Sequence, residues 1–304
     1  MIDSEIIVSA CIITYNHEKY IGDCIEGALK QDINYKYEIV IGDDNSTDAT
    51  ATICQEYANQ YPDIIRFIKR GKNLGMNGNW SDTMMSCGGK YIALCEGDDL
   101  WSDKSKLQQQ VDFLEKNQSY SSCYHGANVI NEHGGLIKDT KWPVYRNHSK
   151  EDLLFVQGEM ITCTVTFRNL VYTKIKLFKG TNLDTYLWHL LGFYGGAKFI
   201  GSIKYSSYRI HSGGVWSVKN DYYKLLKGLY TYDCIADSLL IDGYELKTLH
   251  KISSKVLNVY MMRQLKARKI ILYVKGFFLI FRHKSLDLVF FLKCHLRAVY
   301  KKIN

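Results

Sequence analysis

The first third of the chain repeats one unit, in which a short apolar run is followed by a polar loop and a stretch with helical periodicity. The apolar runs lie at residues 6–14, 37–41, 64–69 and 91–95. Their nearly unbroken hydrophobicity is typical of strands that are covered on both faces. Because strands that alternate with helices form a mostly parallel sheet, the repeat predicts an α/β fold with a Rossmann-like sheet and helices on both of its faces.

Helices are expected between these strands, at residues 20–30, 49–59, 80–87 and 105–116. In the first of them apolar side chains recur at helical spacing and can pack on the sheet; they are Ile21, Cys24, Ile25, Ala28 and Leu29. Residues 70–80, before the third helix, are rich in glycine and begin with bases, which is a weak indication of a phosphate-binding loop. Shorter β-like runs at 121–130 and 160–168 are expected to extend the sheet.

Three acidic side chains, Glu96, Asp98 and Asp99, follow the fourth predicted strand within four positions. The carboxyl end of a strand is where open α/β sheets bind ligands. Carboxylates packed together repel one another and resist burial unless a cation or hydrogen-bond donors compensate. Oxygen ligands of this kind suit Mg²⁺ or Mn²⁺. A solvated acidic turn that caps the next helix is the alternative, and this stretch alone does not decide between the two.

Composition narrows the class of protein. With 304 residues and 46% hydrophobic residues, the chain can form one large domain with an appendage. The nine cysteines are scattered without a Cys-x-x-Cys pair, which argues against a disulfide framework or a zinc ribbon. No basic region followed by an apolar stretch opens the sequence, so no signal peptide is expected and a cytoplasmic location is predicted.

Charge is distributed unevenly along the chain. Of 39 Lys and Arg residues and 31 acids, 14 bases and one acid, Asp287, lie in residues 246–304, which leaves 25 bases and 30 acids elsewhere. The acidic balance of the main part argues against a nucleic-acid-binding core. The basic tail points instead toward an anionic surface such as a membrane.

Four polar segments in a fixed order make the sequence resemble the family 2 glycosyltransferases with the GT-A fold. They are Thr14-Tyr15-Asn16-His17-Glu18, Asp43-Asp44-Asn45-Ser46-Thr47-Asp48, Asn73-Leu74-Gly75 and Glu96-Gly97-Asp98-Asp99. The resemblance covers roughly residues 6–217. It implies a GT-A catalytic domain at 1–217 and leaves 218–304 as a basic helical extension.

The resemblance also implies roles for individual residues. The donor nucleotide sugar is expected to contact Thr14, Tyr15, Glu18, Asp44, Asn73, Glu96 and Arg209. Asp44 suits the imide of uracil or thymine, whereas Asp43 can equally be a structural turn residue. A divalent cation, Mg²⁺ or Mn²⁺, is expected on Asp98, Asp99 and His211. The family's acidic motif is usually Asp-x-Asp, so Glu96 at its first position is a departure, and we assign it to the ribose.

Asp184 stands at the start of an apolar helical run, where the resemblance implies the catalytic base. The expected activity is an inverting transfer of a sugar from a UDP-sugar to a hydroxyl of a saccharide or lipid-linked saccharide. Two alternatives stay open at this point. A sugar nucleotidyltransferase needs a Gly-rich, Arg-containing loop after its first strand, and Tyr15-Asn16-His17-Glu18 contains neither residue. A non-catalytic nucleotide-sugar-binding partner keeps the pocket but dispenses with the base.

The tail has helical character, with its longest apolar stretches around Lys275. These stretches fall short of the ~20 residues that span a bilayer. An in-plane, basic amphipathic anchor on the anionic inner face of a membrane is therefore expected rather than a transmembrane helix. A helical cap packed on the catalytic domain is an equally good interpretation of the same pattern.

Overall fold

The computed structural model describes residues 5–137, 145–155, 160–170, 182–214, 219–267, 269–283 and 285–303. They divide into two compact units. The first contains the described residues of Met1–Leu177 and Leu190–His211, and the second those of Phe178–His189 and Ser212–Asn304. The predicted boundary after residue 217 stays a prediction. The short segment before Leu190 joins the second unit although it precedes that boundary in the sequence.

A seven-stranded sheet with the order β3-β2-β1-β4-β7-β5-β8 forms the centre of the first unit. Its strands are β1 (Val8–Thr14), β2 (Tyr37–Asp43), β3 (Ile65–Lys69), β4 (Tyr91–Glu96), β5 (Tyr120–Tyr124), β7 (Thr166–Arg168) and β8 (Gly196–Phe199). All neighbouring strands run parallel except β7, which is antiparallel to both β4 and β5. The predicted mostly parallel α/β sheet is confirmed.

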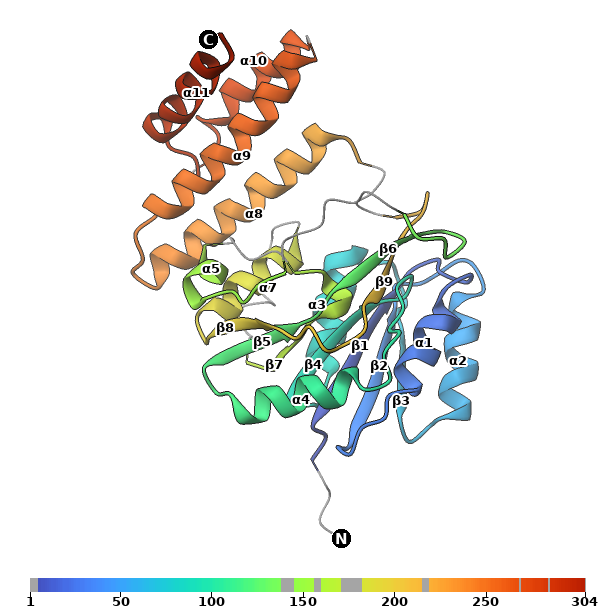
Figure 1. The fold of residues 1–304 in the computed structure, drawn as a ribbon. Helices are drawn as coiled ribbons and strands as arrows, with labels where there is room; N and C mark the ends of the chain where they lie inside the picture. The colour runs from blue at the N-terminus through green and yellow to red at the C-terminus, as the bar shows by residue number, and fades with distance from the viewer. Residues whose placement is uncertain are drawn as a thin grey trace. The chain divides into compact units, whose positions relative to one another are not determined.

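Helices cover both faces of this sheet. They are α1 (Ile21–Leu29), α2 (Thr50–Gln60), α3 (Gly75–Ser86), α4 (Lys106–Lys116) and the short α5 (Lys150–Leu154). Because side chains alternate along a strand, Val8, Ala10 and Ile12 of β1 share one face, and their core cluster includes residues of α1, α2 and α4. Figure 1 shows α3 on the opposite face of the sheet.

Two β-like runs differ from the prediction. Residues 121–130 form two strands, because the chain leaves the main sheet after β5, and β6 (Ala127–Asn131) pairs in parallel with β9 (Ser206–Ile210). Gly126 lies at this exit, where a Cβ atom would come within 2.3 Å of the Tyr205 ring. Of residues 160–168 only β7 is a strand. Thr162–Thr164 form a 3-10 turn, since the Thr164 hydroxyl donates to the Ile161 carbonyl at 2.7 Å.

Helix α3 begins at Gly75, five residues before the predicted start at residue 80. Two side chains outside the helix accept hydrogen bonds from its first amides. Asp44 Oδ1 accepts from the Leu74 N–H at 2.7 Å, and Asn73 Oδ1 accepts from the Gly75 N–H at 2.9 Å. Satisfying these amides offsets the low helix propensity of a glycine-rich start.

The second unit consists of long helices and part of α7 (Leu183–Gly192). The long helices are α8 (Asp221–Ile241), α9 (Lys247–Lys266), α10 (Ile270–Leu279) and α11 (Leu288–Ile303). Leu229, Leu257, Met261 and Phe291 are buried in their common core. The Asn220 side chain caps α8 by accepting from the Tyr223 N–H at 2.9 Å. Within the described part of the chain, no helix is both long and apolar enough to cross a membrane.

Candidate active site

The carboxyl ends of β1, β2 and β4 meet at one edge of the sheet. β1 lies between the other two, and in the parallel register Thr14 is opposite Asp43 while Ile13 is opposite Glu96. The loops that follow these three strands carry most of the residues singled out in the sequence. Because parallel strands end on the same side, the fold brings these loops together, as open α/β sheets do at ligand sites.

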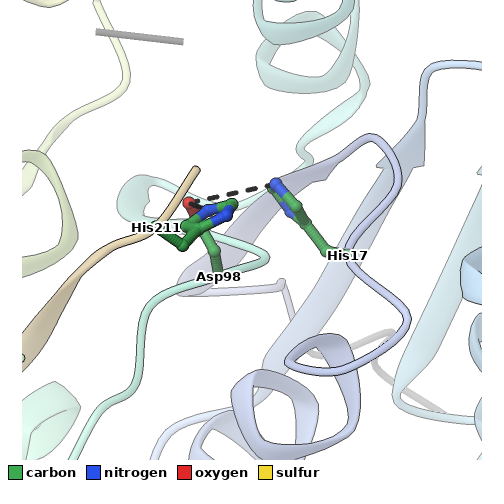
Figure 2. A group of neighbouring side chains, drawn as sticks. All are labelled: His17, Asp98 and His211. Carbon is green, nitrogen blue, oxygen red and sulfur yellow. Dashed lines mark hydrogen bonds and ion pairs between the residues drawn. The ribbon is translucent and has the colours of Figure 1, made fainter. Parts of the chain in front are cut away.

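Three side chains converge at this edge: His17 after β1, Asp98 after β4 and His211 after β9 (Figure 2). The Nε2 atom of His211 lies 3.0 Å from Oδ2 of Asp98, and the Nε2 atom of His17 lies 3.9 Å from the same oxygen. One ligand atom from each residue lies within 4.8 Å of the other two. This set is called the His-Asp-His group below.

Local hydrogen bonds hold His17 in place. Its backbone N–H donates to Oγ1 of Thr50 at 2.8 Å, and its ring Nδ1 lies 3.3 Å from Oγ1 of Thr14. The preceding Asn16 has a φ of 55°, which turns the chain sharply after β1. The second imidazole of the group, that of His211, lies beside the Tyr20 ring with the ring centroids 5.0 Å apart.

The surroundings of the group favour an ionised Asp98 carboxylate and a neutral His17 imidazole. Burial by itself raises the pKa of Asp98, but the hydrogen bond with His211 and the nearby His17 ring lower that pKa below its usual value. Burial lowers the pKa of His17, and the attraction of Asp98 only partly opposes this. A carboxylate with two imidazole nitrogens is a donor set that fits a divalent metal ion.

Asp99 is placed differently from its neighbour Asp98. It is buried, and its Oδ1 accepts a hydrogen bond from the Arg209 N–H at 2.9 Å. Burial, together with the negative charges of Asp98 and Glu96, raises the pKa of Asp99 well above its usual value. Asp99 lies outside the His-Asp-His group, and its predicted role as a metal ligand stays a prediction.

Arg209, predicted to contact the donor, binds the backbone of the acidic loop. Its Nε donates to the Asp98 carbonyl at 2.8 Å, and its guanidinium lies 4.6 Å from the centroid of the Tyr20 ring. These contacts connect β9 to the loop after β4. In this arrangement Arg209 positions the segment that carries Asp98.

The other predicted donor residues lie in the strand-end loops, and several are engaged in local hydrogen bonds. Thr14 is buried, Tyr15 is exposed and Glu96 is half-buried at the end of β4. Glu18 Oε2 accepts from the Ala49 N–H at 3.0 Å, at the start of α2. Asn73 and Asp44 hold the start of α3, as described above. Their assignments to the donor stay predictions.

The alternative interpretation of Asp43, a structural turn residue, agrees with its surroundings. Its carboxylate is fully buried and accepts from the Ser46 N–H at 3.1 Å and from the Ser46 hydroxyl. This is the local side-chain-to-backbone bonding that stabilises turns.

Asp184, the predicted base, lies in the first turn of α7 and belongs to the second unit. Its Oδ1 accepts from the Thr185 N–H at 2.6 Å. Burial raises the pKa of Asp184 above its usual value, although the hydrogen bonds with Thr185 oppose this. A carboxylate with a raised pKa is suited to accept a proton, but its assignment as the base stays a prediction.

His17 is the residue of this site that the sequence analysis did not single out. It stood within one of the four polar segments, but no role was assigned to its side chain. The available signal was its position just after β1, because the carboxyl end of a central strand lies next to that of its parallel neighbour β4.

Solved structures share this architecture. TarS of S. aureus, crystallised in complex with UDP-GlcNAc, has a TM-score of 0.61 at 17% identity, and the match covers 86% of this chain and 73% of that one. The mannosyltransferase PcManGT from Pyrobaculum calidifontis, in complex with GDP-Man and Mn²⁺, has a TM-score of 0.53 at 13% identity, covering 78% and 65%. At these identities the likeness shows the fold, and that fold is the GT-A fold.

The sequence model for glycosyl transferase family 2 matches residues 9–172, more than half of the chain. The chain belongs to glycosyl transferase family 2. Among curated relatives, the uncharacterized protein Rv1520 of Mycobacterium tuberculosis is 35% identical over 211 residues, 69% of this chain and 60% of that protein. The putative glycosyltransferase EpsE of Bacillus subtilis is 37% identical over 128 residues, 42% of this chain and 45% of that one. The chain thus spans about 60% or less of the length of these relatives.

Proposed function

We propose that this glycosyltransferase moves a sugar, with inversion at the anomeric carbon, from a UDP-sugar to a hydroxyl of a saccharide or lipid-linked saccharide. The observation that carries the proposal is the His-Asp-His group at the carboxyl edge of β1 and β4, of which His17 and Asp98 lie inside the region matched to the family. A diphosphate leaving group is anionic, and this is the place in the fold where a cation can be held next to it.

Each proposed role rests on a physical property of the residue. The low pKa of Asp98 keeps its carboxylate ionised, and together with His211 it can hold a divalent ion, Mg²⁺ or Mn²⁺. Such an ion would offset the charge that develops on the diphosphate as the glycosidic bond breaks. Asp184 accepts the proton of the acceptor hydroxyl, and attack from the face opposite the diphosphate inverts the anomeric centre.

The choice of a uridine nucleotide rests on Asp44 and on similar proteins. A carboxylate at this strand end can accept a hydrogen bond from the imide N–H of uracil. Guanine has no imide and presents its N–H donors in a different geometry. TarS was crystallised with UDP-GlcNAc, whereas PcManGT was crystallised with GDP-Man. The test therefore compares a UDP-sugar with GDP-mannose as the donor.

The test is a panel of nucleotide sugars offered to the full chain with Mn²⁺. Calorimetry measures binding, and release of the free nucleoside diphosphate measures slow hydrolysis in the absence of an acceptor. We expect binding and hydrolysis with a UDP-sugar and at least about tenfold weaker binding of GDP-mannose. Preference for GDP-mannose would overturn the choice of uridine. Binding without any turnover, also with saccharide acceptors, would favour the non-catalytic binding protein.

We further propose that α10 and α11 contact an anionic membrane surface at the inner face, which brings the enzyme to a lipid-linked acceptor. In α10 and the turn after it, Ile271, Val274, Phe278 and Phe281 recur at helical spacing and are exposed, Phe278 by 69% and Phe281 by 78%. Lys275 lies between Val274 and Phe278 in the sequence, and Arg282 follows Phe281. Apolar side chains with bases next to them suit an interface of anionic headgroups.

Sedimentation with lipid vesicles tests this contact. We expect the full chain to bind vesicles that contain phosphatidylglycerol and to bind neutral phosphatidylcholine vesicles weakly. The double variant Phe278→Asp/Phe281→Asp should lose the binding, because two charges would enter the apolar interface. Leu136→Asp is the matched control, since Leu136 is an exposed apolar residue of the first unit. Equal binding by the double variant and the control would remove the membrane proposal.

A further inference from the structure

We propose that His17 is a third protein ligand of the divalent ion, together with Asp98 and His211, and that it makes the site prefer Mn²⁺ over Mg²⁺. This inference deepens the proposed function and rests on it only for the use of the ion by the donor diphosphate. The ligand set differs from the predicted one, in which Asp99 took the third place.

The position of His17 supports this assignment. The Nε2 atoms of both histidines approach the same carboxylate oxygen of Asp98, at 3.9 Å from His17 and 3.0 Å from His211. The side chains come from three separate segments, and Figure 2 shows them turned toward one another. Because one ligand atom of each lies within 4.8 Å of the others, small side-chain movements suffice to bring all three to one ion.

A second contact orients the His17 ring. Its Nδ1 lies 3.3 Å from the Thr14 hydroxyl, so a proton on Nδ1 can be donated to that oxygen. The lone pair is then on Nε2, the nitrogen that faces Asp98. A ligand histidine commonly has its other nitrogen held in this way. Thr14, predicted to contact the donor, therefore acts here as a positioning residue for His17.

Gly97 permits the close approach of the two loops. A Cβ atom at Gly97 would lie 2.7 Å from Oγ1 of Thr14 and 3.1 Å from Nδ1 of His17. Any larger side chain would push the turn after β1 away from the loop after β4. The glycine between Glu96 and Asp98 thus sets the distance at which His17 meets Asp98.

Asp99 is less suited to the third place. Its Oδ1 accepts from the Arg209 N–H, and its surroundings are buried and already negative. Asp99 has no ligand atom in the set that lies within 4.8 Å, so coordination by Asp99 would need its buried carboxylate to turn toward the ion. His17 needs no such rearrangement.

The chemistry of the donor atoms predicts the ion. Mg²⁺ prefers oxygen ligands and keeps much of its water, whereas imidazole nitrogens bind first-row transition ions well. The predicted set of Asp98, Asp99 and His211 offers one nitrogen, while the His-Asp-His group offers two. Replacing a carboxylate by an imidazole shifts the preference from Mg²⁺ toward Mn²⁺.

The experiment measures ion binding directly on the full chain, without and with UDP. Electron paramagnetic resonance and calorimetry give the Mn²⁺ and Mg²⁺ affinities, and spin-echo modulation counts the histidine nitrogens bound to Mn²⁺. We expect two such nitrogens and tighter binding of Mn²⁺ than of Mg²⁺ in the native chain. His17→Gln should lose one nitrogen, weaken Mn²⁺ binding at least about tenfold and narrow the preference over Mg²⁺.

Two further variants make the outcome specific. His133→Gln is the matched control, because His133 is an exposed histidine whose Nε2 lies 3.8 Å from a carboxylate oxygen of Glu132, and it should bind Mn²⁺ like the native chain. Asp99→Asn keeps the acceptor for the Arg209 N–H and should also retain both nitrogens and the affinity. Loss of affinity in Asp99→Asn with none in His17→Gln would overturn the proposal.

Thr14→Val provides a second route if His17→Gln unfolds, which thermal unfolding in EDTA would reveal. It retains His17 but removes the oxygen that orients the ring, and we expect Mn²⁺ affinity to fall by about tenfold. Unchanged affinity in Thr14→Val, or a native chain that binds no Mn²⁺, would contradict the inference. A chain that binds Mn²⁺ through two imidazoles but no nucleotide sugar would refute the proposed function instead.

Discussion

The tripeptide Gly-Asp-Asp occurs at two strand ends on either side of β1, and the two copies have different surroundings. Gly42-Asp43-Asp44 ends β2, and Gly97-Asp98-Asp99 follows β4. Both glycines are tightly packed, since a Cβ atom would collide with the side chain of Thr83 at Gly42 and of Thr14 at Gly97. The tripeptides are identical, and only the family resemblance assigned the cation to the second copy.

The last aspartate behaves alike in both copies. Asp44 accepts a hydrogen bond from the Leu74 N–H, and Asp99 accepts one from the Arg209 N–H. In each case a carboxylate holds the backbone of a segment distant in the sequence. The third position of the tripeptide therefore has a structural contact at both strand ends.

The middle aspartate differs between the copies. Asp43 is fully buried and bonds to Ser46 within its own loop. Asp98 faces the imidazoles of His17 and His211, which come from outside its loop. The comparison shows that neighbours from other segments, and not the tripeptide itself, decide which carboxylate faces side chains that can share a metal ion.

The largest effect is expected for Asp98→Asn. Removing the charge that faces both imidazoles should weaken ion binding and lower turnover by about 10³-fold or more, because a bound ion contributes several kcal/mol to the transition state. Mn²⁺ affinity and steady-state rates measure this. If Asp43→Asn lost ion binding to the same extent, the distinction between the two copies would fail.

Asp184→Asn tests whether the reaction needs a carboxylate base that lies outside both Gly-Asp-Asp tripeptides. Loss of the base should lower kcat by about 10²-fold or more while donor affinity stays unchanged. Rates with saturating acceptor and calorimetric donor binding separate the two quantities. Full turnover in this variant would remove Asp184 as the base.

The pH dependence of kcat/KM sharpens the same assignment. A base must be ionised, and burial raises the pKa of Asp184, so activity should fall on acidification through a pKa above the ordinary value of 3.8. Below that pKa the rate should drop about tenfold per pH unit. The residual activity of Asp184→Asn should lack this acidic limb; persistence of the limb would point to another group.

Asp43→Ala is expected to affect stability and not ion binding. It leaves the half-buried N–H and hydroxyl of Ser46 without the Asp43 acceptor, which costs about 1 kcal/mol in the free energy of unfolding. Denaturant unfolding measures the loss, and Mn²⁺ binding on the folded variant serves as the control. A change in Mn²⁺ affinity comparable to that of Asp98→Asn would contradict the structural role.

The smallest effect is expected for Asp44→Asn. The amide retains an oxygen for the Leu74 N–H, so the fold should persist, but it accepts the uracil imide less well, and UDP affinity should fall by about tenfold, or ~1.4 kcal/mol. Calorimetry with UDP measures this. Unchanged UDP affinity would leave Asp44 with its contact to Leu74 as its only role.

Much of the first half of the fold could be predicted from the sequence. Four strands and four helices appear in the predicted order. The spacing of apolar residues within each segment indicates whether it is a strand or a helix, because that spacing determines which side chains can be buried together. The prediction was less accurate where distant side chains intervene. Hydrogen bonds from the Leu74 and Gly75 amides to Asp44 and Asn73 let α3 begin earlier than predicted. The run at 121–130 is divided at Gly126 between two sheets.

The candidate site could be predicted only in part. The polar strand ends were visible, and family resemblance added Asp98 and His211. Their partner His17 was not assigned, because the group depends on the distance between the loops after β1 and β4, which Gly97 and the sheet order set.

By itself, the sequence determined the alternation of strands and helices, the parallel sheet and the edge at which polar side chains gather, because these follow from local periodicity and from the direction of parallel strands. Only the tertiary structure decided that His17 meets Asp98 and His211, and that the Asp43 carboxylate of the other Gly-Asp-Asp tripeptide is enclosed in its own turn. The reason is physical: the ionisation of a buried carboxylate depends on donors a few ångströms away, and here they come from segments as far as 113 positions away in the chain.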